Sequence, residues 1–270
     1  MNKDQLLQKL WDQYVTLAPS AHKIHNIFDE QYGNVKNDHI AFRTFNDPRV
    51  NIEAMSKVFT ACGYEEKGQY EFTAKKLLAK HYEHKTDKDA PKIFISELRL
   101  ELCSEYVQEI VDCLLAISDL HLIDPLELVF QGRLWGKPSH QIYERLREES
   151  EYAAWMYVYG FCPNHFTVFV NKLDKETSLE SVNQLLKDNG FKMNGSGGEI
   201  KGTPEQMLEQ SSILADRLAV DFVEGTYEIP ACYYEFAKRY EDKDGELFDG
   251  FIAGSADKIF ESTNVTLPNQ

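Results

Sequence analysis

The sequence predicts an α+β fold in which two βαβββ modules form one curled mixed sheet. The main observation is an internal repeat: a short β-like run with a histidine at its start occurs at Asn37–Arg43 and again at Asn164–Val170. In both copies a polar turn, an amphipathic helical pattern and a glycine-aromatic pair follow, and the interval from histidine to glycine is 24 residues in one copy and 25 in the other. Further helical patterns precede the first copy and separate the two.

Residues 1–34 are predicted to form two N-terminal helices. Apolar residues recur at helical spacing between Leu6 and Val15, which indicates a helix over 4–17. A second helix is expected from Pro19 to about Gly33, because proline favours the first turn of a helix and glycine often follows the last. We expect these helices to act as a lid or cap ahead of the first module.

The first module is assigned to residues 35–103. Apolar and polar residues alternate from Lys92 onward, as is typical of a strand, whereas alanine and lysine weaken the β pattern within 70–83. We expect, in order, a strand at 38–45, a turn at 46–48, a helix at 52–61, one or two strands within 70–83 and a strand at 92–102.

Residues 104–160 are predicted to be a helical connector. Apolar spacing marks one helix between Tyr106 and Leu115, and further helices are expected at 139–147 and 150–159. The preferred interpretation is a packing spacer between the modules.

The second module is assigned to residues 161–256. A strand is expected from Asn164 to about 173, and Ser178 is a suitable N-cap for a helix that ends at Asn189. Strands at 213–222 and 231–240, a short helix start at 203–206 and a loosely ordered tail at 257–270 complete the prediction. All parts are assigned to a single domain, 1–270.

The composition indicates a globular protein with a substantial core. Of 270 residues, 43% are hydrophobic and 12% aromatic. The formal charge of −15 argues against nucleic acid and against an anionic membrane surface as partners. In so acidic a chain, a basic residue in a pocket suggests an anionic ligand.

The five cysteines show no paired spacing and are interpreted as thiols of a reducing compartment. The charged, amphipathic N-terminus is unlike a signal peptide, and no apolar run approaches the ~18 residues of a membrane span. We therefore expect a soluble, cytoplasmic protein.

His39 and His165 hold equivalent places in the two copies, which suggests a metal site shared by the modules. Two histidines and one carboxylate form the arrangement that leaves positions open on non-haem iron. Glu235 is the leading third candidate, because a lone carboxylate in an aromatic strand is costly to bury without a cation. Glu97 is a rival in the first module.

Other interpretations of these residues stay open. Glu235 could face solvent, or pair with Lys238 or Arg239. A single histidine on a strand is more often a hydrogen-bonded structural residue than a ligand.

The remaining histidines are weaker candidates. His81 and His84 are three residues apart, so on a strand they point to opposite faces and are poor joint ligands. His22 and His25 are interpreted as surface residues of the second helix.

Arg43 faces the same side of its strand as His39, because strand residues four apart share a face. A guanidinium beside a metal site suits bidentate capture of a substrate carboxylate. The alternative is an ion pair with one of the many acidic residues.

Four motifs follow one another along the chain: Asn37-Asp38-His39-Ile40-Ala41-Phe42-Arg43-Thr44, Ile93-Phe94-Ile95-Ser96-Glu97-Leu98, Asn164-His165-Phe166-Thr167, and Tyr233-Tyr234-Glu235-Phe236 with Arg239. Together they resemble the DUF1338 family, whose characterised members are 2-oxoadipate dioxygenase/decarboxylases. The similarity runs from about residue 14 to about 254.

The resemblance implies a vicinal-oxygen-chelate-like fold, Fe(II) held by His39, His165 and Glu235, and substrate contact by Arg43. It implies conversion of 2-oxoadipate and O₂ to 2-hydroxyglutarate and CO₂ within lysine catabolism, with the 2-oxo acid decarboxylated and then hydroxylated. Some family members are longer at the C-terminus, so the exact 2-oxo acid stays open.

Two residue assignments near Glu235 accompany this expectation. Tyr234 and Phe236 face away from Glu235 and are predicted to be core, while Ser212 is a tentative substrate contact. Two other functions remain open: a lyase or isomerase with a divalent Lewis-acid metal, and a non-catalytic oxo-acid-binding protein.

Overall fold

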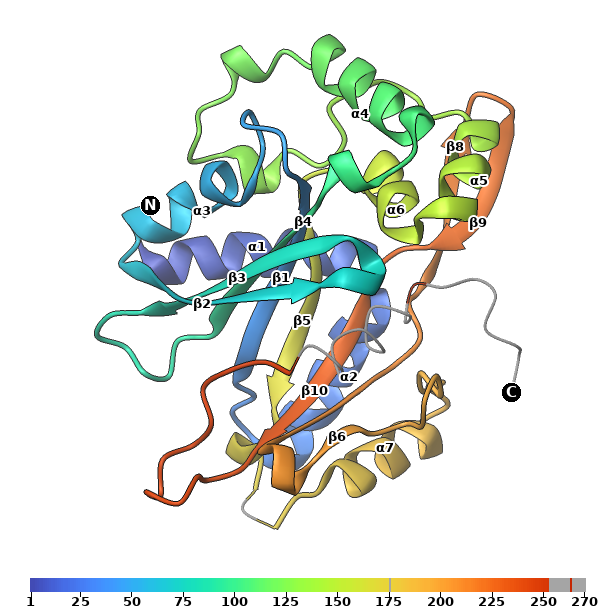
Figure 1. The fold of residues 1–270 in the computed structure, drawn as a ribbon. Coiled ribbons are helices and arrows are strands. Elements are labelled where there is room, and N and C mark those ends of the chain that lie inside the picture. Colours follow the sequence, from blue (N-terminus) through green and yellow to red (C-terminus); the bar gives the residue numbers. More distant parts are fainter. Residues whose placement is uncertain (175, 253–262, 264–270) are drawn as a thin grey trace.

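The structure is a computed structural model that describes residues 1–174, 176–252 and 263. Within these residues the core is an eight-stranded curled sheet of order β2-β3-β4-β1-β5-β10-β7-β6, and β8 and β9 form a separate hairpin (Figure 1). The strands are β1 Asn37–Phe45, β2 Tyr64–Phe72, β3 Leu77–His84, β4 Lys92–Leu98, β5 Pro163–Phe169, β6 Lys201–Thr203, β7 Leu208–Ser212, β8 Arg217–Phe222, β9 Gly225–Pro230 and β10 Tyr233–Arg239. The helices are α1 Lys3–Leu17, α2 Pro19–Tyr32, α3 Ile52–Ala61, α4 Glu105–Ile117, α5 His140–Glu149, α6 Glu151–Tyr159 and α7 Leu179–Asp188.

The predicted α+β fold with two βαβββ modules is confirmed. One module runs β1-α3-β2-β3-β4, and the other runs β5-α7-β6-β7-β10 with the β8–β9 hairpin inserted before its last strand. In each module the first strand pairs in parallel with the last, and the two first strands pair with each other in antiparallel fashion. The equivalent histidine strands therefore lie side by side at the centre of the sheet.

The strand predictions need two corrections. The segment predicted as one strand at 213–222 is wrong: β7 ends at Ser212, an isolated bridge follows at Ile213, and β8 begins only at Arg217. The segment 70–83 holds parts of two strands, and β2 already starts at Tyr64. The start of β2 was missed because this edge strand exposes much of its surface to solvent and is rich in charged residues.

Helices α1 and α2 cover the back of the sheet rather than capping the first module (Figure 1). From α1, the ring of Tyr14 stacks on Phe166 at 4.7 Å between centroids. From α2, the ring of Phe28 meets Phe236 edge to face at 5.7 Å. Both partners lie in the second module, so the expectation of a lid is corrected to a layer beneath the sheet.

The connector contributes more than spacing. Residues 152–159 of α6 are buried, and the Tyr152 hydroxyl hydrogen-bonds to the backbone of Thr44 and Ser96. These contacts fix α6 against the ends of β1 and β4. The connector therefore builds one wall near Arg43.

No helix in the described ranges is long and apolar enough to cross a membrane. The predicted loosely ordered tail, 257–270, lies outside the described residues except for Thr263, which is buried.

Candidate metal centre

Strand register brings the three proposed ligands onto one face of the sheet. Across the central strands, His39 pairs with Thr167 and Thr167 pairs with Glu235, which makes one row. His165 and Tyr233 pair in the next row. Because alternate residues of a strand share a face, both rows point into the concave side of the sheet.

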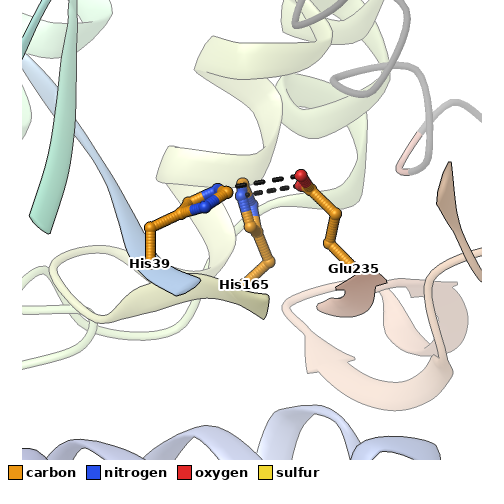
Figure 2. Close-up of side chains that lie close together, drawn as sticks. All are labelled: His39, His165 and Glu235. Carbon is orange, nitrogen blue, oxygen red and sulfur yellow. Dashed lines mark ion pairs between the residues drawn. The ribbon is translucent and has the colours of Figure 1, made fainter. Parts of the chain in front are cut away.

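The possible ligand atoms of His39, His165 and Glu235 all lie within 4.8 Å of one another (Figure 2). Nε2 of His165 is 3.1 Å from one carboxylate oxygen of Glu235, and Nε2 of His39 is 3.7 Å from the other. Ligand atoms at right angles around a divalent ion stand about 3.0 Å apart when each lies ~2.1 Å from it. The cluster is therefore near the size that one ion requires.

Each histidine is oriented by the residue that precedes it. Nδ1 of His39 is 2.8 Å from the Asp38 carboxylate, and Nδ1 of His165 is 3.0 Å from the side-chain oxygen of Asn164. When Nδ1–H donates to these oxygens, each Nε2 presents a lone pair to the cluster. Burial also lowers the pKa of His165, which favours the neutral imidazole that a metal binds.

Glu235 is fully buried and lacks a full set of partners. Gln210 donates to Oε1 at 2.6 Å, but Oε2 has no hydrogen-bond partner among the described residues. Burial acts to raise the pKa of the carboxyl, yet a positive charge on His165 or His39, together with the Gln210 amide, outweighs burial and lowers the pKa. An ionised oxygen facing an imidazole lone pair is repulsive unless a cation lies between them, so these residues fit a divalent metal ion.

A buried ion pair supports His39 from behind. Arg239 donates to both oxygens of Asp38, at 2.6 and 2.8 Å, and also to the backbone carbonyls of Phe248 and Gly250. Burial works against ionisation of Asp38, but Arg239 and then His39 hold its pKa well below the usual range. The acceptor that orients His39 is therefore a permanent carboxylate.

This arrangement settles where Arg239 binds: it pairs with Asp38 rather than with Glu235. Sequence reasoning missed Asp38, Asn164 and Gln210. A signal for the first two was present, since a side-chain acceptor precedes the histidine in both copies of the repeat.

Arg43 lies one row beyond His165 and is 1% exposed. It donates to the Glu151 carboxylate and to the Thr263 hydroxyl, each at 3.2 Å, and the Thr263 hydroxyl also binds Glu151. Its guanidinium carbon is 5.0 and 5.1 Å from the ring centroids of Tyr152 and Trp155. Arg43 thus faces the concave side, as strand alternation predicted, and it forms the ion pair that was the alternative interpretation. Its role as a clamp for a substrate carboxylate stays a prediction.

Glu97 lies apart from the cluster. Its neighbour Ser96 pairs with Arg43, so Glu97 points to the opposite face of the sheet. There it accepts a hydrogen bond from the backbone amide of Ile52 at 3.0 Å, at the start of α3. Burial raises the pKa of this carboxyl.

His81 and His84 have separate local partners. Nδ1 of His81 is 2.9 Å from the Tyr70 hydroxyl and Nε2 is 3.2 Å from Glu83. His84 accepts hydrogen bonds from backbone amides of residues 86 and 87 in the next turn. As expected, they do not form a pair.

Ser212 and Glu235 are register partners, so the buried serine shares the concave face with the candidate ligands. Ser211 points to the other face and hydrogen-bonds to Asn183 of α7 at 2.7 Å. The predicted core position of Tyr234 is confirmed by its contact with Trp11 of α1, 5.9 Å between ring centroids.

Phe251 covers the cluster on the side of the first module. Its ring is 4.9 Å from His39, 5.4 Å from His81 and 4.8 Å from Phe94, measured between centroids. Its backbone amide donates to the Tyr70 hydroxyl at 3.2 Å. An apolar ring in this position shields His39 from solvent.

The paired modules and the buried two-histidine, one-carboxylate cluster are typical of metal-dependent enzymes with a vicinal-oxygen-chelate-like fold. Residues 5–245 match the model of a family described as 2-oxoadipate dioxygenase/decarboxylase. The chain therefore belongs to this family.

Individual relatives agree with the family assignment. The chloroplastic/amyloplastic 2-oxoadipate dioxygenase/decarboxylase of Oryza sativa subsp. japonica is 34% identical, over 93% of this chain and 76% of its own length. A solved hydroxyglutarate synthase from Oryza sativa, in complex with 2-oxoadipate, is 32% identical with a TM-score of 0.89, over 97% of this chain and 91% of that one. A solved protein of Shewanella frigidimarina NCIMB 400, provisionally named a hydrolase, is 45% identical with a TM-score of 0.87, over 93% and 97%.

Proposed function

We propose that this protein is a non-haem Fe(II) dioxygenase that converts 2-oxoadipate, or a similar 2-oxo acid, and O₂ to 2-hydroxyglutarate and CO₂. The observation that carries the proposal is the buried cluster of His39, His165 and Glu235 in a chain of this family. The three side chains would hold the iron on one face and leave positions open on the other. The bound iron would supply the redox chemistry that couples O₂ to the 2-oxo acid.

The atoms of the reaction balance without a second oxo acid. The substrate loses its first carboxylate as CO₂, and its keto carbon becomes the new carboxylate with one oxygen atom from O₂. The other oxygen atom becomes the hydroxyl on the neighbouring carbon. Both atoms of O₂ therefore enter the product, and 2-oxoglutarate is not required as a co-substrate.

The protein residues would orient the substrate and exclude water. With Nδ1–H of the two histidines donating to Asp38 and Asn164, Nε2 of each would carry no proton and could bind the metal, and Phe251 shields the cluster. Arg43 would bind the distal carboxylate, and Ser212 would contact the substrate from β7. The Arg43 row is two residues, or about 6.6 Å, beyond that of His165, and a six-carbon diacid spans ~6 Å between its carboxyl carbons.

The cellular setting is also a proposal. We infer a cytoplasmic location from the five free cysteines, which fit a reducing compartment. We assign the reaction to lysine catabolism, as the family resemblance implies.

An oxygen electrode tests the function. Protein loaded with Fe(II) under nitrogen should consume O₂ when 2-oxoadipate is added, release one CO₂ per O₂, and place two ¹⁸O atoms in 2-hydroxyglutarate when ¹⁸O₂ is used. Turnover that needs no O₂ would instead identify a Lewis-acid lyase or isomerase. Tight binding of oxo acids without turnover would identify a binding protein.

A further inference from the structure

The hydroxyl of Tyr233 is a buried donor that no described residue satisfies. Tyr233 is 0% exposed at the start of β10, and its backbone carbonyl accepts a hydrogen bond from Tyr14. Its own hydroxyl has no hydrogen-bond partner within the described residues. Burying a hydroxyl in this way is unfavourable, and a bound ligand is one means of satisfying it.

The position of Tyr233 relates this donor to the metal cluster. Tyr233 is in register with His165, and the two rings stack at 4.6 Å with an angle of 24° between their planes. Because tyrosine is longer than histidine, the hydroxyl of a tyrosine stacked in this way reaches past the imidazole, toward the open side of the concave face. Arg43 lies one row further along the sheet. The hydroxyl thus lies beside the path from the metal ligands to Arg43.

We propose that the Tyr233 hydroxyl donates a hydrogen bond to an oxygen of the 2-oxo-carboxylate end of the substrate. This rests on the proposed function, which puts a 2-oxo acid in this site. Because Tyr233 shares a row with His165, its hydroxyl is expected to contact the end of the substrate that lies nearest the metal. The distal carboxylate is assigned to Arg43. Tyr233 is then a substrate-binding residue.

Tyr234 provides a matched control. It is also a fully buried tyrosine whose hydroxyl has no hydrogen-bond partner among described residues. It points to the back of the sheet, where its ring lies 5.9 Å from Trp11 and 5.5 Å from Phe236. Replacing this hydroxyl removes the same atoms from the same strand but leaves the concave face unchanged.

Anaerobic calorimetric titration of the Fe(II)-loaded full-length protein tests the proposal. Tyr233→Phe should weaken the binding of 2-oxoadipate about 10-fold or more, since a hydrogen bond to a charged group is lost. The substitution should weaken the binding of 2-oxohexanoate, which lacks the distal carboxylate, by a similar factor. Bound iron should be unchanged, and the melting temperature should be unchanged or higher because an unsatisfied hydroxyl is removed. Tyr234→Phe should bind both acids as the wild type does.

Three results would overturn the proposal. The first is wild-type affinity in Tyr233→Phe. The second is a loss confined to 2-oxoadipate, which would assign the hydroxyl to the distal carboxylate. The third is loss of iron or of folding in Tyr233→Phe, which would indicate a structural role.

Failure of the proposed function is recognised separately. A wild-type protein that binds both acids but consumes no O₂ refutes the dioxygenase function, and the titration still decides the role of Tyr233. A wild-type protein that binds neither acid overturns both proposals.

Discussion

Replacing Asp38 by asparagine should weaken metal binding and destabilise the fold at once. The carboxylate uses both oxygens as acceptors, because it binds Nδ1 of His39 on one side and two nitrogens of Arg239 on the other. Asparagine offers a single acceptor oxygen, so either His39 or Arg239 must face an NH₂ group. The change also leaves the 2%-exposed Arg239 without its counter-charge.

The structure sets the magnitudes of both effects. Removing one partner of a buried ion pair lowers the free energy of unfolding by about 3–5 kcal/mol. We expect about 3 kcal/mol for Asp38→Asn, because asparagine keeps the shape of the side chain and Arg239 keeps its two backbone carbonyl partners. Loss of the residue that orients a histidine ligand should lower metal affinity roughly 10- to 100-fold. Urea unfolding of the metal-free protein measures the first effect, and equilibrium dialysis against Fe(II) under nitrogen measures the second.

Asp47→Asn is the matched control. Asp47 also binds the guanidinium of an arginine, Arg49, through two hydrogen bonds of 2.8 Å, but here the arginine is 40% and the aspartate 21% exposed, and neither residue is one of the candidate ligands. Loss of this ion pair should lower the free energy of unfolding by less than about 1 kcal/mol and leave the metal affinity unchanged. If Asp38→Asn matched Asp47→Asn in both measurements, the supporting role of Asp38 would be refuted.

The same carboxylate predicts sensitivity to acid. The pKa of Asp38 is lower in the folded protein than the ~3.9 of an unfolded chain. Its contribution to stability is therefore complete above about pH 4 and is lost as the pH falls toward the folded-state pKa. Asp38→Asn should remove this part of the slope of stability against pH, measured by urea unfolding between pH 3 and pH 6.

Further predictions concern the ligands and Arg43. His39→Ala, His165→Ala and Glu235→Ala should each lose bound iron while remaining folded, measured by metal analysis and circular dichroism; Glu235→Ala with full metal content would contradict the ligand assignment. Glu97→Ala should keep its metal, because Glu97 faces away from the cluster. Arg43→Ala should retain iron and raise KM for 2-oxoadipate at least 10-fold, whereas unchanged steady-state kinetics would reject its role as a carboxylate clamp.

The repeat was enough to predict the fold, because it encodes both the strand-helix order and the equivalence of His39 and His165. The face of each strand also followed from alternation, which correctly separated Glu235 from Tyr234. These features depend on local periodicity, which a single sequence carries.

Contacts between distant segments could not be predicted in the same way. Arg239 is 201 positions from Asp38, and their pairing depends on the register between β1, β5 and β10. Glu151 reaches Arg43 only because α6 packs against the end of β1. The false strand at 213–222 has a related cause: an apolar, alternating segment can leave the main sheet and form a separate hairpin, which composition does not reveal.

The central pairing of β1 with β5 has a mechanical consequence for the whole chain. An ion held by His39 of one module and by His165 and Glu235 of the other would cross-link residues that are 126 positions apart, as a disulfide does in a secreted protein. It would join the modules at the strand pair where they meet. The binding free energy of the ion would then stabilise the contact between the two modules. The free energy of unfolding of the metal-loaded protein should rise by RT ln(1 + [metal]/Kd).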